Sequence, residues 1–349
     1  MKRILITGSG GPAGVNFVDS LRSAPEKMFL VGADANRIHL CWPDTDKKFV
    51  IPRADNSSYI DKLNELIEKE SIELIHPQPD IEVSVVSDNR DRIKAITYLP
   101  KKETVDICQD KYKSSTHWKR DGLQTVKTIY VSSMEDLKEA EKLFGYPYWL
   151  RASVGFSSRG STLVERPETA KAWIDYWVSR GTEWKFIAQE YLPGKIIAFQ
   201  SIWKDGQLVT SQARERIEYL YHYLAPSGIT NTPVVAKTLH RDDVNEIATR
   251  AVLSIDKNAT GIFCVDLRED KNGRPVPTEI NTGRFFTTSF FFTKAGINMP
   301  YYYVKLAFGE DIPELPRYNA IPEGVYWCRH IDCPGVLLRD GDLDGVPAI

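Results

Sequence analysis

The segment "GIFCVDLREDKNGRPVPTEIN", residues 261–281, reads as two β-strands joined by a tight Asn-Gly turn. Asp266 lies on the first strand, and Glu279 and Asn281 lie on the second. Glu279 and Asn281 face the same side of their strand, because side chains alternate between the two faces. Carboxylate and amide oxygens are hard ligands that Mg²⁺ accepts alongside phosphate oxygens. The segment therefore predicts a Mg²⁺ site, and the simpler alternative is a solvated charge pair on a hairpin.

The N-terminal stretch "ILITGSGGPAG", residues 4–14, runs from a short apolar strand into a glycine-rich turn. Its glycines have the spacing of a dinucleotide-binding fingerprint. Further short apolar strands at 30–32 and 74–76 alternate with helix-like segments, in which apolar residues recur every three or four positions. This alternation of strands and helices predicts a parallel sheet with helices on its faces.

The glycine turn allows a second hypothesis, an NAD(P)-dependent reductase or epimerase. Asp34 ends the second strand, where it could bind ribose hydroxyls or simply cap a turn. A short-chain dehydrogenase also needs a Tyr and a Lys four residues apart on a helix. Tyr98 and Lys102 are separated by a proline, which would break the helix, and Tyr301 and Lys305 come too late in the chain. The turn alone is therefore weak support for this hypothesis.

The composition excludes several classes of protein. The 349 residues are 42% hydrophobic and 26% charged, as in ordinary globular chains, and the net charge of −2 gives no field that would gather nucleic acid or anionic membrane. Five cysteines without a CxxC pair favour a reducing compartment. No apolar run reaches the roughly 20 residues of a membrane span. We therefore expect a cytoplasmic protein without nucleic-acid or membrane partners, and a homodimer is left open.

The pattern changes near residue 105, where a linker leads into a new helix that begins at about Lys111. From about residue 186 the strands are joined by short turns, such as Asp205-Gly206, which is typical of antiparallel hairpins. A parallel sheet followed by antiparallel hairpins predicts two architectures in one chain. The expected fold class is therefore α/β together with α+β.

Three groups of motifs carry a resemblance to a known family. They are "DKYKSSTHWKR" with "YWLRASVGFSSRGSTLVE" (within 110–165), "FIAQEYLPGK" (186–195) and "CVDLREDKNGRPVPTEIN" (264–281). Together these resemble the successive motifs of the ATP-grasp superfamily, in particular the ATP-binding module of the carbamoyl-phosphate synthetase large chain. The resemblance covers about residues 1–312. It implies a Rossmann-like pre-ATP-grasp domain (1–105), a two-lobed ATP-grasp domain (106–312, with a lid at about 106–185 and a metal-binding subdomain at about 186–312) and a C-terminal extension (313–349).

The resemblance also implies roles for individual residues. It places Ile196 where the family often has a ribose-binding Glu, and it moves the Arg that follows the metal ligands by one position, to Arg284. For Arg214 and Arg216 the alternative is a pair of exposed strand arginines. The implied sites are the phosphates (Lys111, Arg151 and the loop residues Arg159 and Gly160), adenine (Glu190, Tyr191, Leu192), the metal (Asp266, Glu279, Asn281) and the substrate carboxylate or γ-phosphate (Arg216, Arg284).

The reaction implied by the resemblance is an ATP-dependent ligation. A small-molecule carboxylate attacks the γ-phosphate of ATP to give an acyl phosphate and ADP, and an amine then displaces phosphate. The cofactors would be ATP and Mg²⁺, with Mn²⁺ as a substitute, and the partners would be a carboxylate and an amine. Besides the reductase, a nucleotide-binding module that has lost its chemistry stays open as an alternative.

Overall fold

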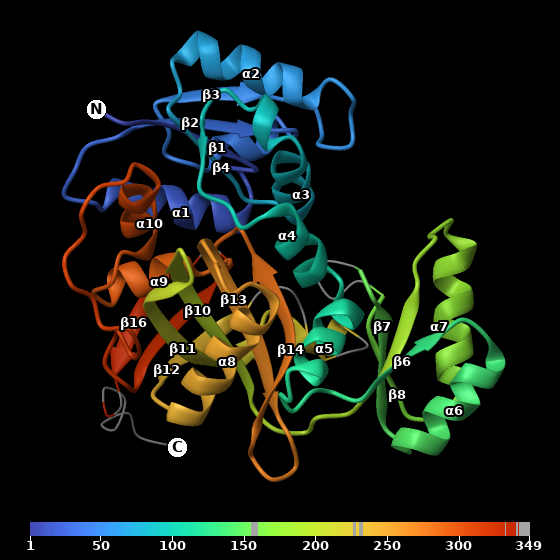
Figure 1. Cartoon of the computed structure of the whole chain (residues 1–349). Helices are drawn as coiled ribbons and strands as arrows, with labels where there is room; N and C mark the ends of the chain where they lie inside the picture. Colours follow the sequence, from blue (N-terminus) through green and yellow to red (C-terminus); the bar gives the residue numbers. More distant parts are fainter. Residues whose placement is uncertain (155–159, 226–227, 230–232, 332, 340, 342–349) are drawn as a thin grey trace.

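The computed structural model describes residues 1–154, 160–225, 228–229, 233–331, 333–339 and 341. Their strands form three sheets, of five, seven and four strands. Figure 1 shows the N-terminal sheet at the top, the seven-stranded sheet below it and the four-stranded sheet to one side. The predicted combination of α/β and α+β architecture is confirmed.

The N-terminal sheet has the order β3-β2-β1-β4-β5, and its neighbouring strands are parallel, as predicted. In the central strand, Ile4 and Ile6 pack on one face of the sheet, and Leu5 packs on the other face. The strands are β1 (Arg3–Thr7), β2 (Phe29–Asp34), β3 (Lys47–Val50), β4 (Leu74–Pro77) and β5 (Ile96–Thr97). The helices are α1 (Pro12–Arg22) beside Ile4 and Ile6, α2 (Tyr59–Glu70) beside Leu5, α3 (Asp80–Asp88) and the short turns η1 (Ile38–Cys41) and η2 (Arg90–Arg92).

Residues from other parts of the chain pack tightly against the glycine turn after β1. Gly8 has a φ of +58°, and a Cβ there would lie 2.3 Å from Pro79 Cγ. A Cβ on Gly10 would lie 2.5 Å from His39 Cβ. The amide of Gly10 donates to the Asp34 carboxylate at 3.1 Å, so Asp34 caps this turn. The structure therefore gives these residues a packing role, which was the simpler of the two alternatives.

The four-stranded sheet is antiparallel, in the order β6-β9-β7-β8. Its apolar face packs on two helices, and Leu137 and Ala170 are buried there among the strand residues. We call this unit the lid sheet. It consists of β6 (Thr128–Val131), α6 (Met134–Phe144), β7 (Tyr148–Ala152), β8 (Thr162–Val164), α7 (Pro167–Ser179) and β9 (Phe186–Glu190).

The seven-stranded central sheet is also antiparallel, in the order β14-β13-β10-β11-β12-β15-β16. Ile197, Phe199 and Val265 on one face pack against Trp118 and the apolar stripe of α8. The strands are β10 (Ile196–Lys204), β11 (Gln207–Tyr219), β12 (Pro233–Leu239), β13 (Gly261–Glu269), β14 (Pro275–Thr282), β15 (Val325–His330) and β16 (Cys333–Arg339). The associated helices are α4 (Lys102–Gln109), α5 (Lys111–Arg120), η3 (His222–Leu224) and α8 (Asp242–Ile255).

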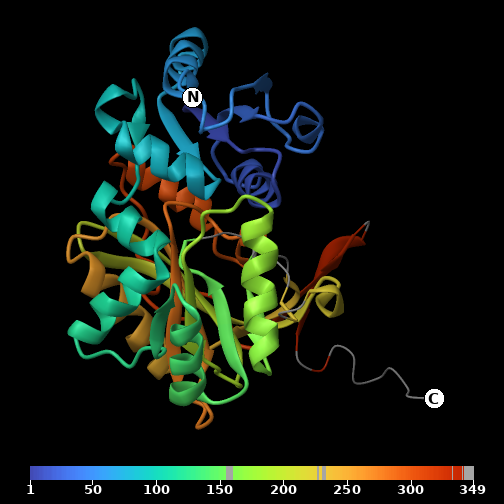
Figure 2. The same ribbon diagram turned by 90° about the vertical axis from the view of Figure 1, so that its right-hand side faces the viewer.

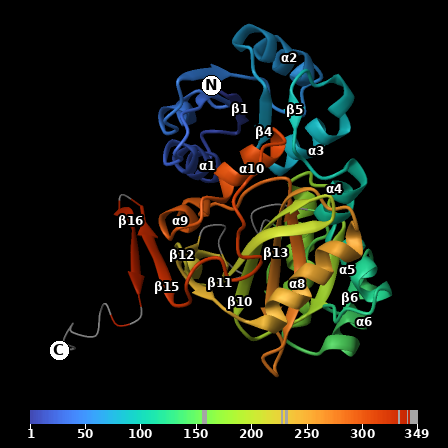
Figure 3. The ribbon, with the colours of Figure 1, turned by 60° about the vertical axis from the view of Figure 1, so that its left-hand side comes forward.

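Two C-terminal helices, α9 (Ser289–Lys294) and α10 (Met299–Ala307), join the N-terminal sheet to the central sheet. Phe291 and Tyr303 on these helices share one apolar cluster with Ile6 of β1 and Ile262 of β13. Figures 2 and 3 show the β15–β16 hairpin projecting at the edge of the central sheet, away from the lid sheet. No helix in the described part of the chain is long and apolar enough to cross a membrane.

A stability prediction concerns Glu82 of α3, which is 5% exposed. The pKa of Glu82 is raised from 4.5 to about 7, because burial, together with the nearby charge of Asp34, outweighs the Thr7 and Tyr59 hydroxyls, which lower it. The folded state then binds the Glu82 proton more tightly than the unfolded chain, so stability is lost as the pH rises from 4.5 to 7. Glu82→Gln should remove this loss, on the order of 3 kcal/mol at pH 8.

Urea unfolding of wild type and Glu82→Gln between pH 4.5 and 8 measures this effect. Glu65→Gln on α2, whose side chain is 62% exposed, serves as the control and should follow the wild-type curve. Parallel pH curves for wild type and Glu82→Gln would contradict the assignment.

Candidate active site

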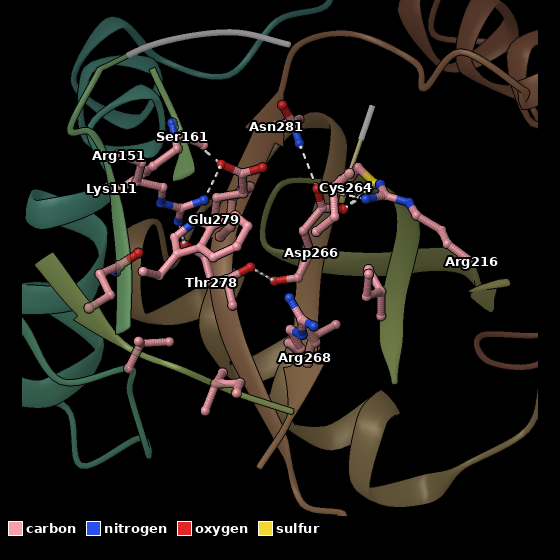
Figure 4. A pocket seen from close by; sticks show the side chains of 18 of the residues that line it. Lys111, Arg151, Ser161, Arg216, Cys264, Asp266, Arg268, Thr278, Glu279 and Asn281 are labelled. Atoms are coloured by element: carbon pink, nitrogen blue, oxygen red, sulfur yellow. Dashed lines mark hydrogen bonds and ion pairs between the residues drawn. The ribbon is translucent and has the colours of Figure 1, made fainter. Parts of the chain in front are cut away.

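The predicted hairpin forms strands β13 and β14, and its register brings the acidic residues side by side. Asp266 pairs directly with Glu279, and Cys264 pairs with Asn281. A bulge after this pair places Leu267 opposite Pro277, so that Thr278 is the extra residue. Except for Pro277, these positions line one pocket, together with residues of the lid sheet and Asp80 at the start of α3. Figure 4 shows Asp266, Glu279 and Asn281 in this pocket.

The carboxylate of Asp266 forms a bidentate ion pair with Arg216 of β11. The nitrogen–oxygen distances are 2.7 and 3.3 Å. Arg216 reaches over β10, where Asp266 pairs with Ala198, whose short side chain leaves room for the guanidinium. Burial raises the pKa of Asp266, Arg216 lowers it, and the neighbouring Glu279 raises it. Arg216 is therefore a buried counter-ion, in contrast to the exposed strand arginine that the sequence allowed.

Glu279 faces two cations from different parts of the chain. Its Oε2 lies 3.4 Å from Lys111 Nζ and 3.5 Å from Arg151 Nη1. Lys111 begins α5, and Arg151 lies on β7 of the lid sheet. Burial alone would raise the pKa of Glu279, but Lys111 and Arg151 outweigh it and lower the pKa to about 2. This carboxylate is therefore charged, and it connects the lid sheet to the central sheet.

Asn281 lies on the same face of β14, and its two amide atoms have different partners. Its Nδ2 donates to Asp266 at 3.4 Å, and its Oδ1 accepts from Arg284 at 2.7 Å. Arg284 also pairs with Asp80, the first residue of α3. The amide oxygen therefore faces Arg284, whereas the amide nitrogen faces the carboxylates. Asp80 was missed, although it follows the carboxyl end of a parallel strand, a usual place for ligand contacts.

The hinge residues Glu190, Tyr191 and Leu192 line the same pocket. Glu190 is already engaged with Lys127, since its amide donates to the Lys127 carbonyl at 3.1 Å and its carboxylate accepts from the Lys127 amide at 3.0 Å. Tyr191 lies beside Arg268, whose guanidinium is 5.1 Å from its ring centre. Leu192 is buried in an apolar cluster. Tyr191 and Leu192 thus give this wall of the pocket an aromatic and apolar character, and the Glu190 amide and carboxylate are engaged with Lys127.

The loop that contains Arg159 and Gly160 was expected to cover phosphates, but Arg159 lies outside the described residues. Gly160 has a φ of +75°, and a Cβ there would lie 2.7 Å from Trp184. Its carbonyl accepts from Trp173 Nε1 at 2.9 Å. Gly160 therefore packs the end of the loop against two tryptophans of the lid sheet.

The pocket residues fit a polyanion that carries a divalent cation. The buried Nε atoms of Arg151, Arg216 and Arg268 have no hydrogen-bond partner in the part of the chain that the structure describes, so they can donate to phosphate oxygens. The described residues contain no cluster of three or more His, Cys, Asp or Glu that could hold a metal. Two carboxylates, Asp266 and Glu279, suit Mg²⁺ bound together with phosphate oxygens.

A lid sheet, a central antiparallel sheet with paired carboxylates and a cationic pocket between them define an ATP-grasp fold. Comparison with known proteins agrees with this. Residues 4–99 match the PylC-like N-terminal domain family. The chain is 22% identical over 326 residues to the carbamoyl phosphate synthase large chain of Clostridium acetobutylicum, covering 90% of this chain and 30% of that protein. The chain thus spans less than a third of the length of this relative.

Solved structures show the same fold along nearly the whole chain. The N5-carboxyaminoimidazole synthetase of Staphylococcus aureus complexed with ADP has a TM-score of 0.71 at 16% identity, covering 99% of this chain and 84% of that chain. The L-amino acid ligase of Bacillus licheniformis has a TM-score of 0.70 at 14% identity, covering 94% and 79%. The biotin carboxylase domain of 2-oxoglutarate carboxylase from Hydrogenobacter thermophilus has a TM-score of 0.69 at 19% identity, covering 94% and 74%. The fold that the resemblance implied is therefore confirmed.

The buried ion pair gives a prediction for stability. Arg216→Met should destabilise the protein by about 3–5 kcal/mol, because Asp266 is then left as an unpaired buried charge. In the double variant with Asp266→Asn most of this loss should be recovered, since neither charge remains. Urea unfolding of the single and double variants measures the coupling.

Arg274→Met is the matched control, because its ion pair with Asp270 lies on the exposed hairpin turn. This variant should lose less than about 1 kcal/mol. If Arg216→Met and Arg274→Met lost the same free energy of unfolding, the buried ion pair would stabilise the protein no more than the exposed one.

Proposed function

We propose that the protein is an ATP-dependent ligase that phosphorylates a small-molecule carboxylate to an acyl phosphate and couples it to an amine, releasing ADP and phosphate. The observation that carries this proposal is the pairing of Asp266 with Glu279 in a pocket where Lys111, Arg151 and Arg216 face them. The similarity to the carbamoyl phosphate synthase large chain and to the fold of an L-amino acid ligase supports it.

The cations of the pocket would act by electrostatics. In the proposed reaction a carboxylate oxygen of the acid forms a bond to the γ-phosphorus, and the bond between the β- and γ-phosphates breaks. Lys111 and Arg151 now face Glu279 and would exchange part of this contact for phosphate oxygens. Their charge would offset the repulsion between two anions, which otherwise opposes the attack.

In the second step the amine nitrogen attacks the acyl carbon, phosphate leaves with the electron pair of its bond, and the nitrogen loses one proton. Arg216 contacts Asp266, and Arg284 contacts Asn281. These two arginines would hold the reacting carboxylate or the phosphate in transit. A water-excluding pocket would protect the acyl phosphate from hydrolysis. The hinge residues Glu190, Tyr191 and Leu192 would receive adenine.

Asp266 and Glu279, with the amide oxygen of Asn281 after a turn away from Arg284, would hold the divalent cation. Bound Mg²⁺ supplies charge neutralisation of the phosphates. We extend the proposal to Mn²⁺, since it accepts the same oxygen ligands. We also propose Arg159 and Gly160 as phosphate-loop residues, the cytoplasm as the location and a homodimer as the assembly.

Glu279→Gln provides the test of this function. The substitution keeps the shape of the side chain and removes the charge that faces Lys111 and Arg151. We expect ADP release in mixtures of carboxylic acids and amines to fall by about 100-fold or more. Calorimetry with Mg-ATP should show weaker binding, whereas ATP without Mg²⁺ should bind the variant at least as tightly as wild type, because the charge that competes for Lys111 and Arg151 is gone.

Glu215→Gln is the matched control, because Glu215 lies on β11 of the same sheet and pairs with Lys195 outside the pocket. It should keep the wild-type rate. Wild-type turnover in Glu279→Gln would exclude the proposed site, and ATP binding without turnover in any mixture would favour a non-catalytic module.

A further inference from the structure

Arg214 of β11 lines the pocket but lies away from the paired carboxylates. The register runs from Glu279 to Asp266, to Ala198 and then to Arg214, across strands β14, β13, β10 and β11. Three strand spacings separate the backbones of Glu279 and Arg214 by about 14 Å. Arg214 therefore lies at the opposite end of the pocket from Lys111 and Arg151.

Arg214 is 1% exposed, which makes it a buried cation. Its Nη1 donates to the Thr288 hydroxyl at 2.8 Å, and its guanidinium carbon lies 3.5 Å from the centre of the Phe286 ring. Within the described ranges no carboxylate lies at ion-pair distance from it, and its buried Nε has no hydrogen-bond partner. Asp266 forms its ion pair with Arg216 and acts on Arg214 only from a greater distance, so no carboxylate among the described residues contacts Arg214 directly.

A buried charge without a counter-ion is costly, and a ligand anion can remove that cost. Burial and the neighbouring Arg216 lower the pKa of Arg214 to about 9, a value at which the guanidinium is still charged at neutral pH. The guanidinium packs over the ring of Phe286, and its Nε–H has no acceptor among the described residues, so one side of the group still has a donor to offer. The edge of a guanidinium matches the two oxygens of a carboxylate.

We infer that Arg214 binds a substrate carboxylate that is not phosphorylated in the reaction. This inference rests on the proposed function, because it assumes that the phosphoryl group is transferred beside Asp266 and Glu279. Arg214 lies two strands from Asp266 and three from Glu279, and Arg216 is the arginine that contacts Asp266, so we assign to Arg214 a carboxylate other than the one that is activated. The compound that carries it is either an amine with a carboxylate of its own, such as an amino acid, or an acid with two carboxylates.

Ligand-dependent thermal stability of the full chain with Mg-ADP tests the inference. One series compares α-amino acids with their α-amides, and the other compares dicarboxylic acids with their monoamides. We expect some compounds with the free carboxylate to raise the melting temperature of the wild type, whereas the matched amides should not. The series that responds identifies whether the amine or the acid carries the second carboxylate.

The variants Arg214→Met and Arg214→Lys separate binding from folding. In Arg214→Met the apparent affinity for the responding compound should fall by about 10- to 100-fold, with the Mg-ADP shift retained. Arg214→Lys keeps the charge but loses the planar edge, so it should fold and bind more weakly than wild type. Arg90→Met is the control, because the Arg90 guanidinium donates to the backbone carbonyls of Leu99 and Pro100 outside the pocket.

Three results would overturn the inference: amides that stabilise the wild type as well as the free acids do, wild-type affinity in both Arg214 variants, or no response of the wild type to any carboxylate in the two series. A lower melting temperature in Arg214→Met without a change in ligand affinity would mean that Arg214 only supports the Phe286 and Thr288 segment. If Mg-ADP did not raise the melting temperature of the wild type, this would instead count against the proposed function.

Discussion

The site depends on two carboxylates that are held side by side in a buried position. Asp266 and Glu279 are directly paired across β13 and β14, and like charges so close repel each other strongly where water is excluded. Such a pair is stable only with cations around it. Arg216 comes from β11, Lys111 from α5 and Arg151 from the lid sheet. The need to compensate these two charges therefore draws three separate segments of the chain into one pocket.

The same compensation explains why the pocket suits a bound triphosphate with a divalent cation. A divalent cation bound by Asp266 and Glu279 would neutralise part of their negative charge. The surrounding arginines and lysine would then interact less with these carboxylates and more with the phosphate oxygens. The buried Nε atoms of Arg151, Arg216 and Arg268 can take further acceptors in the described structure. On binding, the charged side chains would thus change partners without having to move far, which limits the reorganisation that binding demands.

The sequence predicted those features that local patterns determine. The β13–β14 hairpin, the shared face of Glu279 and Asn281 and the parallel N-terminal sheet all follow from short-range periodicity, and all are confirmed. Asp80 was not predicted, because it meets Arg284 across 204 positions of sequence, a contact that no local pattern marks. The burial of Arg214 was missed for a similar reason, since it depends on Phe286 and Thr288, more than 70 positions later in the chain. The orientation of the Asn281 amide follows from Arg284 and was equally inaccessible.

The glycine turn that first suggested a nicotinamide enzyme contributes to the pocket by an indirect route. Gly8 allows Pro79 to pack directly on the turn, since a Cβ there would lie 2.3 Å from Pro79 Cγ. Pro79 is followed by Asp80, and the Asp80 carboxylate pairs with Arg284 in the pocket. Any side chain at position 8 would displace this segment and, with it, the partner of Arg284. A fingerprint that resembles dinucleotide binding can therefore arise from close packing, because both demand glycine wherever two pieces of backbone or a phosphate must approach closely.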